Sequence, residues 1–560
     1  MKTLKLIVVC IIIIFVRSPA RAQSLPEGTT AIEDYYRRAQ LSSAADTNVS
    51  FTIRPLFPNQ INTNYIQSSS DSLPGKYKLL SLKNLYQSSD KKFQLSLLPF
   101  NVETQFTSHH PYGWNDGAMI PAKGAEAFVS AGIFMCYGPL TIQLKPEFIT
   151  VQNSEFDTFN KNSSANALVR YYSIYNNIDL PARFGTGPYT KIYWGQSSVR
   201  LNYKAVSFGL STENLWWGPG IRNSLLMSNT APGFPHLTLN TRHPVQTPIG
   251  SFEAQVIAGN LDASGYSPLE QDNIYHGANL YVRKPNNWRY INGIIATWQP
   301  KWIPGLFLGA DHSSVYYLKS LDVFNDFIPL FPSDVSDGRS IRLTSVFMRW
   351  LWTQEHAEIY FEWGQYNNTS GVLQESLAPN AQRAYVFGIR KLLPFGSSKD
   401  ENILLGIEAT QLQTNSYANI FTGDEWYTNR YVRQGYTYQG QELGAGIGPG
   451  GNLQTVDVSW VKGLKKLGLQ LERYAHNNDL YYLTYTNTRD FRRHWVDLSM
   501  AAIGEWNYKN LIFNAKIQAI KSFNYQWYLP VDSTKPTNSV TVSGVDAFNL
   551  QVQAGATYLF

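Results

Sequence analysis

A short stretch between residues 214 and 229 contains the densest group of side chains that could bind a ligand. It combines aromatic rings, amides and a guanidinium group: Asn214, Trp216, Trp217, Arg222, Asn223 and Asn229. Recognition of a saccharide needs flat apolar faces for the C–H surface of a pyranose ring, and amide or charged groups for its hydroxyls. The stretch is therefore a candidate polysaccharide-binding loop. The alternative interpretation is structural: these residues would fold a loop into the lumen of a barrel as a constriction, with Trp216 and Trp217 packing against barrel-wall residues.

Glycines and prolines surround these side chains. They are Gly218, Pro219, Gly220, Pro232, Gly233 and Pro235. Glycine allows positive φ angles and proline fixes φ, so together they would hold the backbone in turns and make the side chains converge. We interpret these six residues as loop-shaping. A second place for glycan contact is a longer polar segment, 414–452, which contains Tyr427, Tyr431, Tyr436 and Tyr438. The alternative for these tyrosines is an aromatic belt at the membrane interface.

The elements that would position this loop are strands with one apolar and one polar face. From Phe548 to Phe560, apolar residues alternate with polar or small ones, and the same alternation recurs at 252–258, 356–363, 403–410 and 513–519. A period of two with acids and amides on one face is typical of a strand between lipid and a wet lumen. About 16 to 18 such segments fit between Phe93 and Phe560. The predicted fold class is all-β, a transmembrane antiparallel β-barrel over residues 91–560.

Composition agrees with a barrel. Charged residues make up only 16% of the chain and aromatic residues 14%, whereas a soluble protein has about 25% charged residues. Residues 1–22 hold four basic and no acidic groups, so their removal leaves 43 basic against 41 acidic groups and lowers the formal net charge from +6 to +2. A balanced charge argues against nucleic acid as a partner, because that partner needs a clustered basic face.

Both ends of the chain carry signals for export to the outer membrane. Lys2 and Lys5 precede an apolar stretch at 6–16 that is too short to span a bilayer, and Ala20 and Ala22 fit a signal-peptidase site. We expect residues 1–22 to be a cleaved signal peptide. Phe560 ends the chain on an aromatic residue, which resembles the signal recognised by the barrel-insertion machinery. After cleavage Cys136 is the only cysteine, so no intrachain disulfide can form.

Residues 23–90 differ from the barrel pattern. Thr30 and Glu33 fit a capping box, and Ile32, Tyr35 and Tyr36 fall on one helical face. We therefore predict a small helical and extended segment that lies in the periplasm or plugs the barrel mouth. The alternative is an unstructured leader. Longer polar segments within the barrel region, at 153–166, 262–274 and 414–452, are expected to be extracellular loops.

The motif LWWGPG at 215–220, followed by SNTAPGFPH at 228–236, is similar to the capsule assembly (Wzi-type) family of outer-membrane proteins, in the form found in Bacteroidetes. PYGWNDG at 111–117, LERYAHNND at 471–479 and NYQW at 524–527 match more loosely. The resemblance covers most of the chain from about residue 85. It implies an 18-stranded barrel with a periplasmic helical part. It also implies attachment or organisation of capsular polysaccharide at the cell surface, in a lectin-like manner without catalysis.

From this resemblance we expect outer-membrane lipid and capsular or surface polysaccharide as partners, a monomeric state and no cofactor. Catalytic and metal-binding residues are expected to be absent. His236 and His243 have no nearby acidic residues, and Glu358 and Glu362 would lie about 13 Å apart on one strand, too far for a glycosidase pair.

Two alternatives stay open. One is a porin or an export channel for polysaccharide or small solutes, whose selectivity would depend on the inward-facing residues Glu253, Glu358, Glu362, Glu408 and Lys516. The other is an outer-membrane hydrolase with a Ser-His pair. The sequence specifies neither the glycan nor whether the lumen is open.

Overall fold

The computed structural model describes residues 30–57, 83–160, 163–268, 273–320, 340–366, 382–396, 400–414, 425–485, 493–528 and 546–560. Its helices are α2 (Thr30–Leu41), α3 (Ala165–Tyr175) and α5 (Asn478–Tyr485), with short 3-10 turns η3 (Leu318–Ser320) and η6 (Tyr525–Trp527). No helix among these residues is both long and apolar enough to cross a bilayer. The helix predicted near Thr30 is present as α2.

Strands dominate the described chain. The first half contains β1 (Ile53–Arg54), β2 (Lys83–Gln87), β3 (Phe93–Thr107), β4 (Gly124–Tyr137), β5 (Leu140–Leu144), β6 (Glu147–Val151), β7 (Tyr189–Tyr193), β8 (Ser198–Tyr203), β9 (Val206–Ser211), β10 (Trp216–Trp217), β11 (His236–Thr241), β12 (Val245–Thr247), β13 (Gly250–Leu261), β14 (Ile274–Tyr275) and β15 (Ala278–Asn279). The second half contains β16 (Arg289–Pro300), β17 (Leu306–Tyr317), β18 (Ser340–Trp352), β19 (Ala357–Tyr366), β20 (Arg383–Pro394), β21 (Glu401–Gln411), β22 (Thr437–Tyr438), β23 (Gln441–Glu442), β24 (Asn452–Lys462), β25 (Lys465–Ala475), β26 (Val496–Tyr508), β27 (Leu511–Phe523) and β28 (Ala547–Tyr558).

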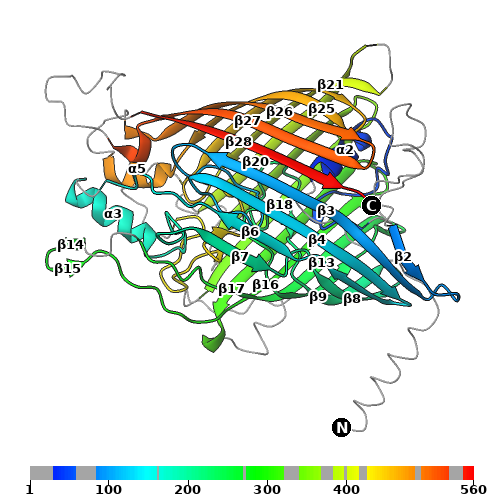
Figure 1. Ribbon diagram of the computed structural model, residues 1–560, viewed down its shortest axis with the longest axis horizontal. Helices are drawn as coiled ribbons and strands as arrows, with labels where there is room; N and C mark the ends of the chain where they lie inside the picture. Colours follow the sequence, from blue (N-terminus) through cyan, green and yellow to red (C-terminus); the bar gives the residue numbers. More distant parts are fainter. Residues whose placement is uncertain are drawn as a thin grey trace, which may run out of the picture.

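These strands form a closed antiparallel barrel, as predicted (Figure 1). Three barrel strands are interrupted, so β5 with β6, β7 with β8, and β11 with β12 each make one strand. Counted this way, the described barrel has 18 strands from β3 to β28. It closes where β28 pairs with β3, and β2 adds a short pairing along β3. The predicted number of about 18 is confirmed.

The predicted alternation of faces is also present in the strands. On β27 and β28, Ile517 and Phe548 are 55% and 59% exposed on the outside, whereas Gln518 and Asn549 are fully buried inside. Apolar side chains can face lipid, and amides can find hydrogen-bond partners in the interior. The strand periodicity therefore decides which residues line the lumen.

The two ends of the barrel differ in their connections. At one end successive strands are joined by short turns such as 138–139, 204–205 and 463–464, and the chain terminates there after β28. At the other end the connections are long and carry α3 and α5 (Figure 1). We call these the turn end and the loop end. In outer-membrane barrels short turns face the periplasm and long loops face outward.

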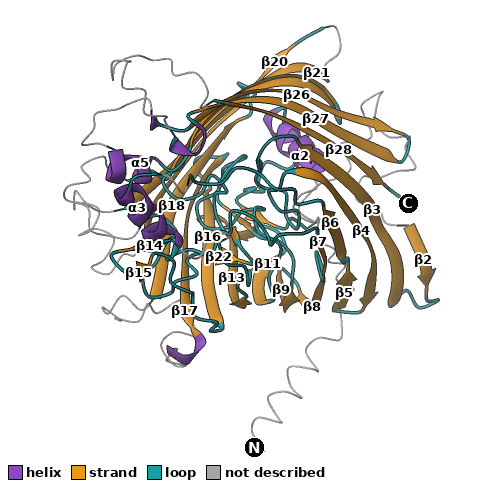
Figure 2. Ribbon diagram, turned by 60° about the vertical axis from the view of Figure 1, so that its left-hand side comes forward, coloured by secondary structure: helices purple, strands orange, loops and turns teal. Residues whose placement is uncertain are grey.

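Helix α2 lies inside the barrel near the turn end (Figure 2). The apolar side of the helix, with Ile32 and Tyr36, packs in one cluster with Leu464, Ile512 and Leu559 of the turn end. The chain after the helix continues inward, and β1 pairs antiparallel with β10 of the 212–235 connection. The N-terminal segment and a long loop thus meet within the lumen.

Long connections from the loop end also fold into the barrel. One apolar cluster joins Trp217 and Leu225 with Trp426 and Tyr436, and it includes inward-facing wall residues such as Ile291. An enclosed apolar cluster of this size fixes the loops against the wall, since its displacement would expose large aromatic surfaces to water. The described lumen therefore has a packed core of its own.

Candidate functional site

The connection between β9 and β11, residues 212–235, enters the lumen and is held there by wall carboxylates. Glu408 of β21 accepts hydrogen bonds from three consecutive backbone N–H groups, those of Ile221 at 2.8 Å, Arg222 at 3.1 Å and Asn223 at 2.9 Å. Tyr360 donates its hydroxyl to the same carboxylate at 2.8 Å. An ionised acceptor with several donors makes strong hydrogen bonds, so the loop backbone is firmly positioned.

Trp217 is placed as a structural residue. Its side chain is fully buried and donates its indole N–H to Gln255 of β13 at 2.8 Å. Gly293 of β16 lies beneath the ring, where an added Cβ atom would stand 2.7 Å from the ring carbon Cη2. The strand thus needs glycine at this point for the indole to approach the wall.

The neighbouring Trp216 is only 2% exposed, but it lines a cavity. The guanidinium of Arg54 lies over the indole ring at 4.8 Å from its centroid. One face of Trp216 is therefore already occupied by a cation–π contact. The two tryptophans, which the sequence placed together as candidates, have different environments.

The three candidate asparagines are buried within the loop. Asn214 donates to Asn229 Oδ1 at 2.7 Å and to the Ala231 carbonyl at 2.8 Å, which ties the two sides of the loop together. Asn229 in turn donates to the carbonyl of Asn115 at 2.9 Å. Asn223 is completely buried and lines neither cavity described below.

The loop-shaping residues lie where the backbone is crowded. An added Cβ at Gly220 would stand 1.8 Å from the Asn223 carbonyl oxygen, and one at Gly233 would stand 1.9 Å from that of Thr212. Gly218 has a φ of +119°. Pro219 presents its carbonyl to Arg37 of α2 at 2.7 Å, while Pro232 is buried and Pro235 is exposed. The glycines therefore permit close backbone approaches that a side chain would block.

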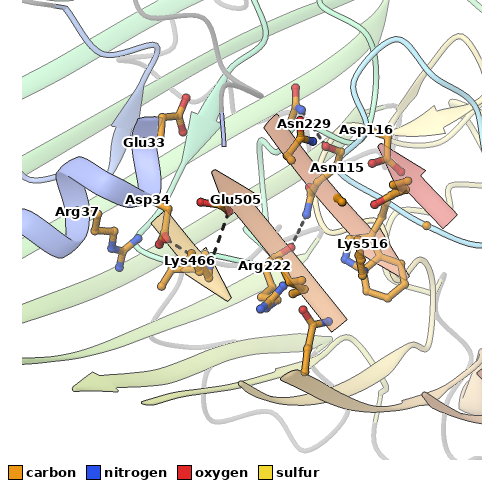
Figure 3. Close-up of a pocket in the computed structure, with 18 of the residues that line it drawn as sticks. Glu33, Asp34, Arg37, Asn115, Asp116, Arg222, Asn229, Lys466, Glu505 and Lys516 are labelled. Atoms are coloured by element: carbon orange, nitrogen blue, oxygen red, sulfur yellow. Dashed lines mark hydrogen bonds and ion pairs between the residues drawn. The ribbon is translucent and has the colours of Figure 1, made fainter. Parts of the chain in front are cut away.

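A cavity of about 290 Å³ lies between α2 and the 212–235 loop (Figure 3). A second cavity of about 160 Å³ adjoins it. The two share five lining residues: Asn115, Asp116, Asn229, Asn514 and Gln553. Of the six candidate binding residues, Trp216, Arg222 and Asn229 reach these cavities. Asn214, Trp217 and Asn223 do not, so the structure brings together only half of the candidates around an open space.

Charged side chains of both signs line the two cavities. The acidic ones are Glu33, Asp34, Glu103, Asp116, Glu147, Glu472 and Glu505. The basic ones are Arg37, Arg54, Lys145, Arg222, Arg390, Lys466 and Lys516. The formal charge of the lining is therefore zero.

Most of the basic groups are paired. Arg37 binds Glu358 at 3.0 Å, Arg54 binds Glu33 at 3.2 Å and Arg222 binds Asp457 at 3.4 Å. Lys516 and Lys145 differ, because the side-chain nitrogen of neither forms an ion pair or hydrogen bond with the described part of the chain. In Figure 3 Lys516 lies beside Asp116, close to the labelled asparagines.

The pKa values of two carboxyl groups outside the strands are shifted in opposite directions. Burial disfavours ionisation of Asp34, but the nearby cations Lys466, Arg390 and Arg38 outweigh it and hold the pKa of Asp34 well below its usual value. For Asp116 burial prevails over the influence of Lys516 and of a hydrogen bond from Gln553, and raises its pKa to about 6. The surroundings of Asp34 thus favour its charged form, whereas those of Asp116 favour its neutral form.

The cavity residues Trp114, Asn115 and Asp116 were not among the sequence candidates. They belong to the PYGWNDG motif at 111–117, between β3 and β4, and they meet the 212–235 loop through Asn115. The Asn115 side chain donates to the Arg222 carbonyl at 2.5 Å. The motif's similarity to the family pattern was the available signal.

The prediction of glycan contact by loop tyrosines is wrong for three of the four residues. Tyr427 and Tyr436 are fully buried and Tyr438 is 4% exposed, whereas Tyr431 is 51% exposed. Their segment folds into the lumen, and Tyr427 donates its hydroxyl to the Leu225 carbonyl at 2.6 Å. Burial in the luminal core removes these rings from the cell surface.

The inward-facing acids of the channel alternative have internal partners. Glu253 accepts a hydrogen bond from the Ser50 backbone at 2.8 Å, Glu358 binds arginines, and Glu408 holds the loop. Glu362 accepts from the Leu225 backbone at 3.3 Å. These four acids anchor inserted segments. Within the described ranges, no group of three or more His, Cys, Asp and Glu side chains is arranged to hold a metal ion.

Comparison with known proteins agrees with the fold. The sequence model of the capsule assembly protein Wzi family matches residues 146–289. The barrel is similar to Wzi of Escherichia coli, an outer-membrane protein involved in group 1 capsule assembly and described as a carbohydrate-binding β-barrel. The TM-score is 0.61 at 12% identity, covering 97% of this chain and 100% of that one.

Other solved barrels are less similar. Acinetobacter baumannii OccAB2 has a TM-score of 0.37 at 10% identity and covers 82% of this chain and 97% of its own, and Pseudomonas aeruginosa OccK8 (OprE) has 0.38 at 8% identity with 83% and 97% covered. No curated protein sequence matches the chain significantly. The assignment to the Bacteroidetes form stays a prediction. Residues 146–289 therefore match the capsule assembly protein Wzi family, and they lie in a barrel whose fold is similar to that of Escherichia coli Wzi.

Proposed function

We propose that this protein binds capsular or surface polysaccharide without catalysis and attaches or organises it at the cell surface. The observation that carries the proposal is the composition of the luminal cavity, in a chain whose residues 146–289 match this family. Trp114 and Trp216 supply aromatic surface, amides such as Asn115 and Asn229 supply donors and acceptors, and Lys516 supplies a cationic donor. This is the mixture that a pyranose and its hydroxyls require.

The polysaccharide partner is supported by the Escherichia coli structure, which is described as a carbohydrate-binding barrel. That protein and this one share the fold at only 12% identity. We therefore choose the residues that would contact sugar from the cavity of this chain and do not transfer them from the other structure. The candidate loop contributes Trp216, Arg222 and Asn229. We assign Asn214, Trp217 and Asn223 a supporting role, because their side chains are buried away from the cavities.

We also propose that residues 23–90 include a plug and that residues 91–560 form the membrane barrel. Helix α2 and the chain up to Arg54 occupy the turn end of the lumen, held by Glu358, Arg390 and Lys466 of the wall. The proposal includes cleavage of residues 1–22, a monomer in outer-membrane lipid, and insertion by way of the aromatic C-terminus at Phe560.

The test is polysaccharide retention in a strain from which the gene is deleted. Cell-bound and released polysaccharide are measured separately. We expect the polymer to be made but shed into the medium, and retention to return with the wild-type gene or with Glu355→Gln, a change at an exposed turn. Unchanged amounts of bound and released polymer in the deletion strain would rule out an attachment role.

A further inference from the structure

The luminal cavity contains polar groups that the protein itself does not satisfy. Gln470 and Gln551 line it and are each only 1% exposed, yet both amide atoms of Gln470 and the amide oxygen of Gln551 have no partner among the residues that the structure describes. The indole N–H of Trp216 also has none. Buried polar groups in native proteins are nearly always hydrogen-bonded, so these cavity atoms are available to a hydroxyl-bearing guest.

Lys516 is the more accessible of the two cavity lysines that form no ion pair, since Lys145 is only 2% exposed. It lies on β27 close enough to Asp116 and Glu472 to interact with them electrostatically, but it forms no ion pair or hydrogen bond with the described residues. A lysine ammonium has three donors and a carboxylate has only acceptors. A hydroxyl group placed between them can accept from Lys516 and donate to Asp116 at the same time.

The charge balance of the cavity argues against an acidic guest. Its five acidic and six basic side chains nearly balance, and all the basic ones except Lys516 are already paired with carboxylates. Lys145, the other lysine without an ion pair, lines only the adjoining cavity, where it interacts electrostatically with Glu147 and Glu103. An incoming carboxylate would lose its hydration, and the one cation without an ion pair that it would meet here, Lys516, already interacts electrostatically with Glu472 and Asp116.

Trp114 supplies the remaining element. Its ring is partly exposed and meets Tyr112 and Tyr474 in tilted and edge contacts with centroids 5.7 and 5.6 Å apart, whereas the ring of Trp216 is covered by Arg54. Aromatic faces are the usual platform for the apolar side of a sugar ring. Trp114 and Lys516 therefore offer complementary contacts to one pyranose.

We propose that the cavity between α2 and the 212–235 loop is a subsite for an uncharged, hydroxyl-rich sugar unit, stacked on Trp114 and hydrogen-bonded by Lys516 and Asp116. This inference rests on the proposed polysaccharide binding and specifies the class of sugar and its place in the barrel. The inference concerns this cavity only and does not depend on contacts between the exposed loops and the polymer.

The experiment uses the full mature protein in detergent and isothermal titration with a matched pair of probes. One probe is an α-1,4-linked galacturonate hexamer, and the other is the same hexamer with its carboxyl groups reduced to alcohols. We expect the reduced, uncharged hexamer to bind at least about tenfold more tightly, because it does not have to desolvate a carboxylate that finds no ion-pair partner in the cavity. Tighter binding of the acidic hexamer, or no binding of the reduced one, would overturn the inference.

Variants locate the binding. Lys516→Met and Trp114→Leu should each weaken binding of the reduced hexamer about tenfold. Lys521→Met on the same strand is the matched control, because Lys521 is 45% exposed, pairs with Asp546 and lies outside the cavity. Heat-modifiable gel migration verifies folding, and Trp114→Phe replaces the leucine variant if that one does not fold. Wild-type affinity in both cavity variants would place the sugar elsewhere and refute the subsite.

Titration with polysaccharide released from the cells separates the two proposals. If that polymer binds but the reduced hexamer does not, the cavity inference fails and the proposed function stands. If the polymer does not bind either, the proposed function fails, and the cavity subsite fails with it.

Discussion

Two inserted regions of this barrel are held by wall carboxylates in different ways. At the turn end, Glu358 binds Arg37 of α2 and Arg349 of β18, and Asp34 of α2 binds Arg390 and Lys466 of the wall. These contacts join charged side chains. In the middle of the lumen, Glu408 instead accepts the backbone N–H groups of residues 221–223. The first region is held by ion pairs between side chains, and the second is held by hydrogen bonds from backbone N–H groups to a carboxylate.

The difference separates position from conformation. An ion-pair network fixes where α2 lies, but each member needs its opposite charge, because a buried charge without a partner is costly. Backbone hydrogen bonds to Glu408 fix the conformation of the loop that carries Trp216 and Arg222 to the cavity. Substitution of Glu358 should therefore affect mainly the stability of the fold, and substitution of Glu408 should affect mainly the conformation of the loop.

The largest effect is expected for Glu358→Gln. The change leaves the buried guanidinium groups of Arg37 and Arg349 without their anion, and it should lower the free energy of unfolding by about 3–5 kcal/mol. Urea titration with heat-modifiable gel migration would measure it. Glu355→Gln removes an exposed pair with Lys391 and should cost less than about 1 kcal/mol. Equal losses in the two variants would contradict the ion-pair network.

A smaller effect is expected for Glu408→Gln. The amide keeps one acceptor oxygen but loses the charge shared by three backbone donors, so the loss should be about 1.5–3 kcal/mol. Trypsin cleavage after Arg222 reports the loop conformation directly and should become faster in this variant than in Glu358→Gln. Faster cleavage in Glu358→Gln would mean that α2, and not Glu408, holds the loop.

The smallest effects concern pH. The lowered pKa of Asp34 stabilises the fold above its unfolded pKa near 4, and this contribution is lost only as the pH falls below about 4. Asp116 has an opposite effect on stability, because burial raises its pKa to about 6. Its ionisation should lower the free energy of unfolding by about 1 kcal/mol as the pH rises from 4 to 6.

Asp116→Asn isolates the second effect. Above pH 6 this variant should be more stable than the wild type by that amount, and the difference should vanish near pH 4. Unfolding titrations of both proteins at several pH values would measure it. A constant difference across this range would show that Asp116 does not titrate within it.

The barrel could be predicted because the alternation of apolar and polar residues in each strand can be seen within a short stretch of sequence. Alternation at Phe548–Phe560 and on the strand with Glu358 and Glu362 follows from the two faces of a strand, which any short window reveals. The candidate site was predictable in part. Trp216, Arg222 and Asn229 reach the cavity, but Trp217 is a wall contact, and Trp114 and Asp116 come from a loop about 100 residues earlier. No periodicity links such distant segments.

The sequence by itself determined the strand faces, the helix at Thr30 and the glycine-rich turns, because each depends on neighbours within a few residues. Only the tertiary structure decided what fills the lumen. Wall acids that suggested a channel, such as Glu358 and Glu408, are paired with α2 and with the 212–235 loop. A carboxylate facing inward is equally compatible with water and with a buried partner. Which of them it meets depends on where segments hundreds of residues away come to lie.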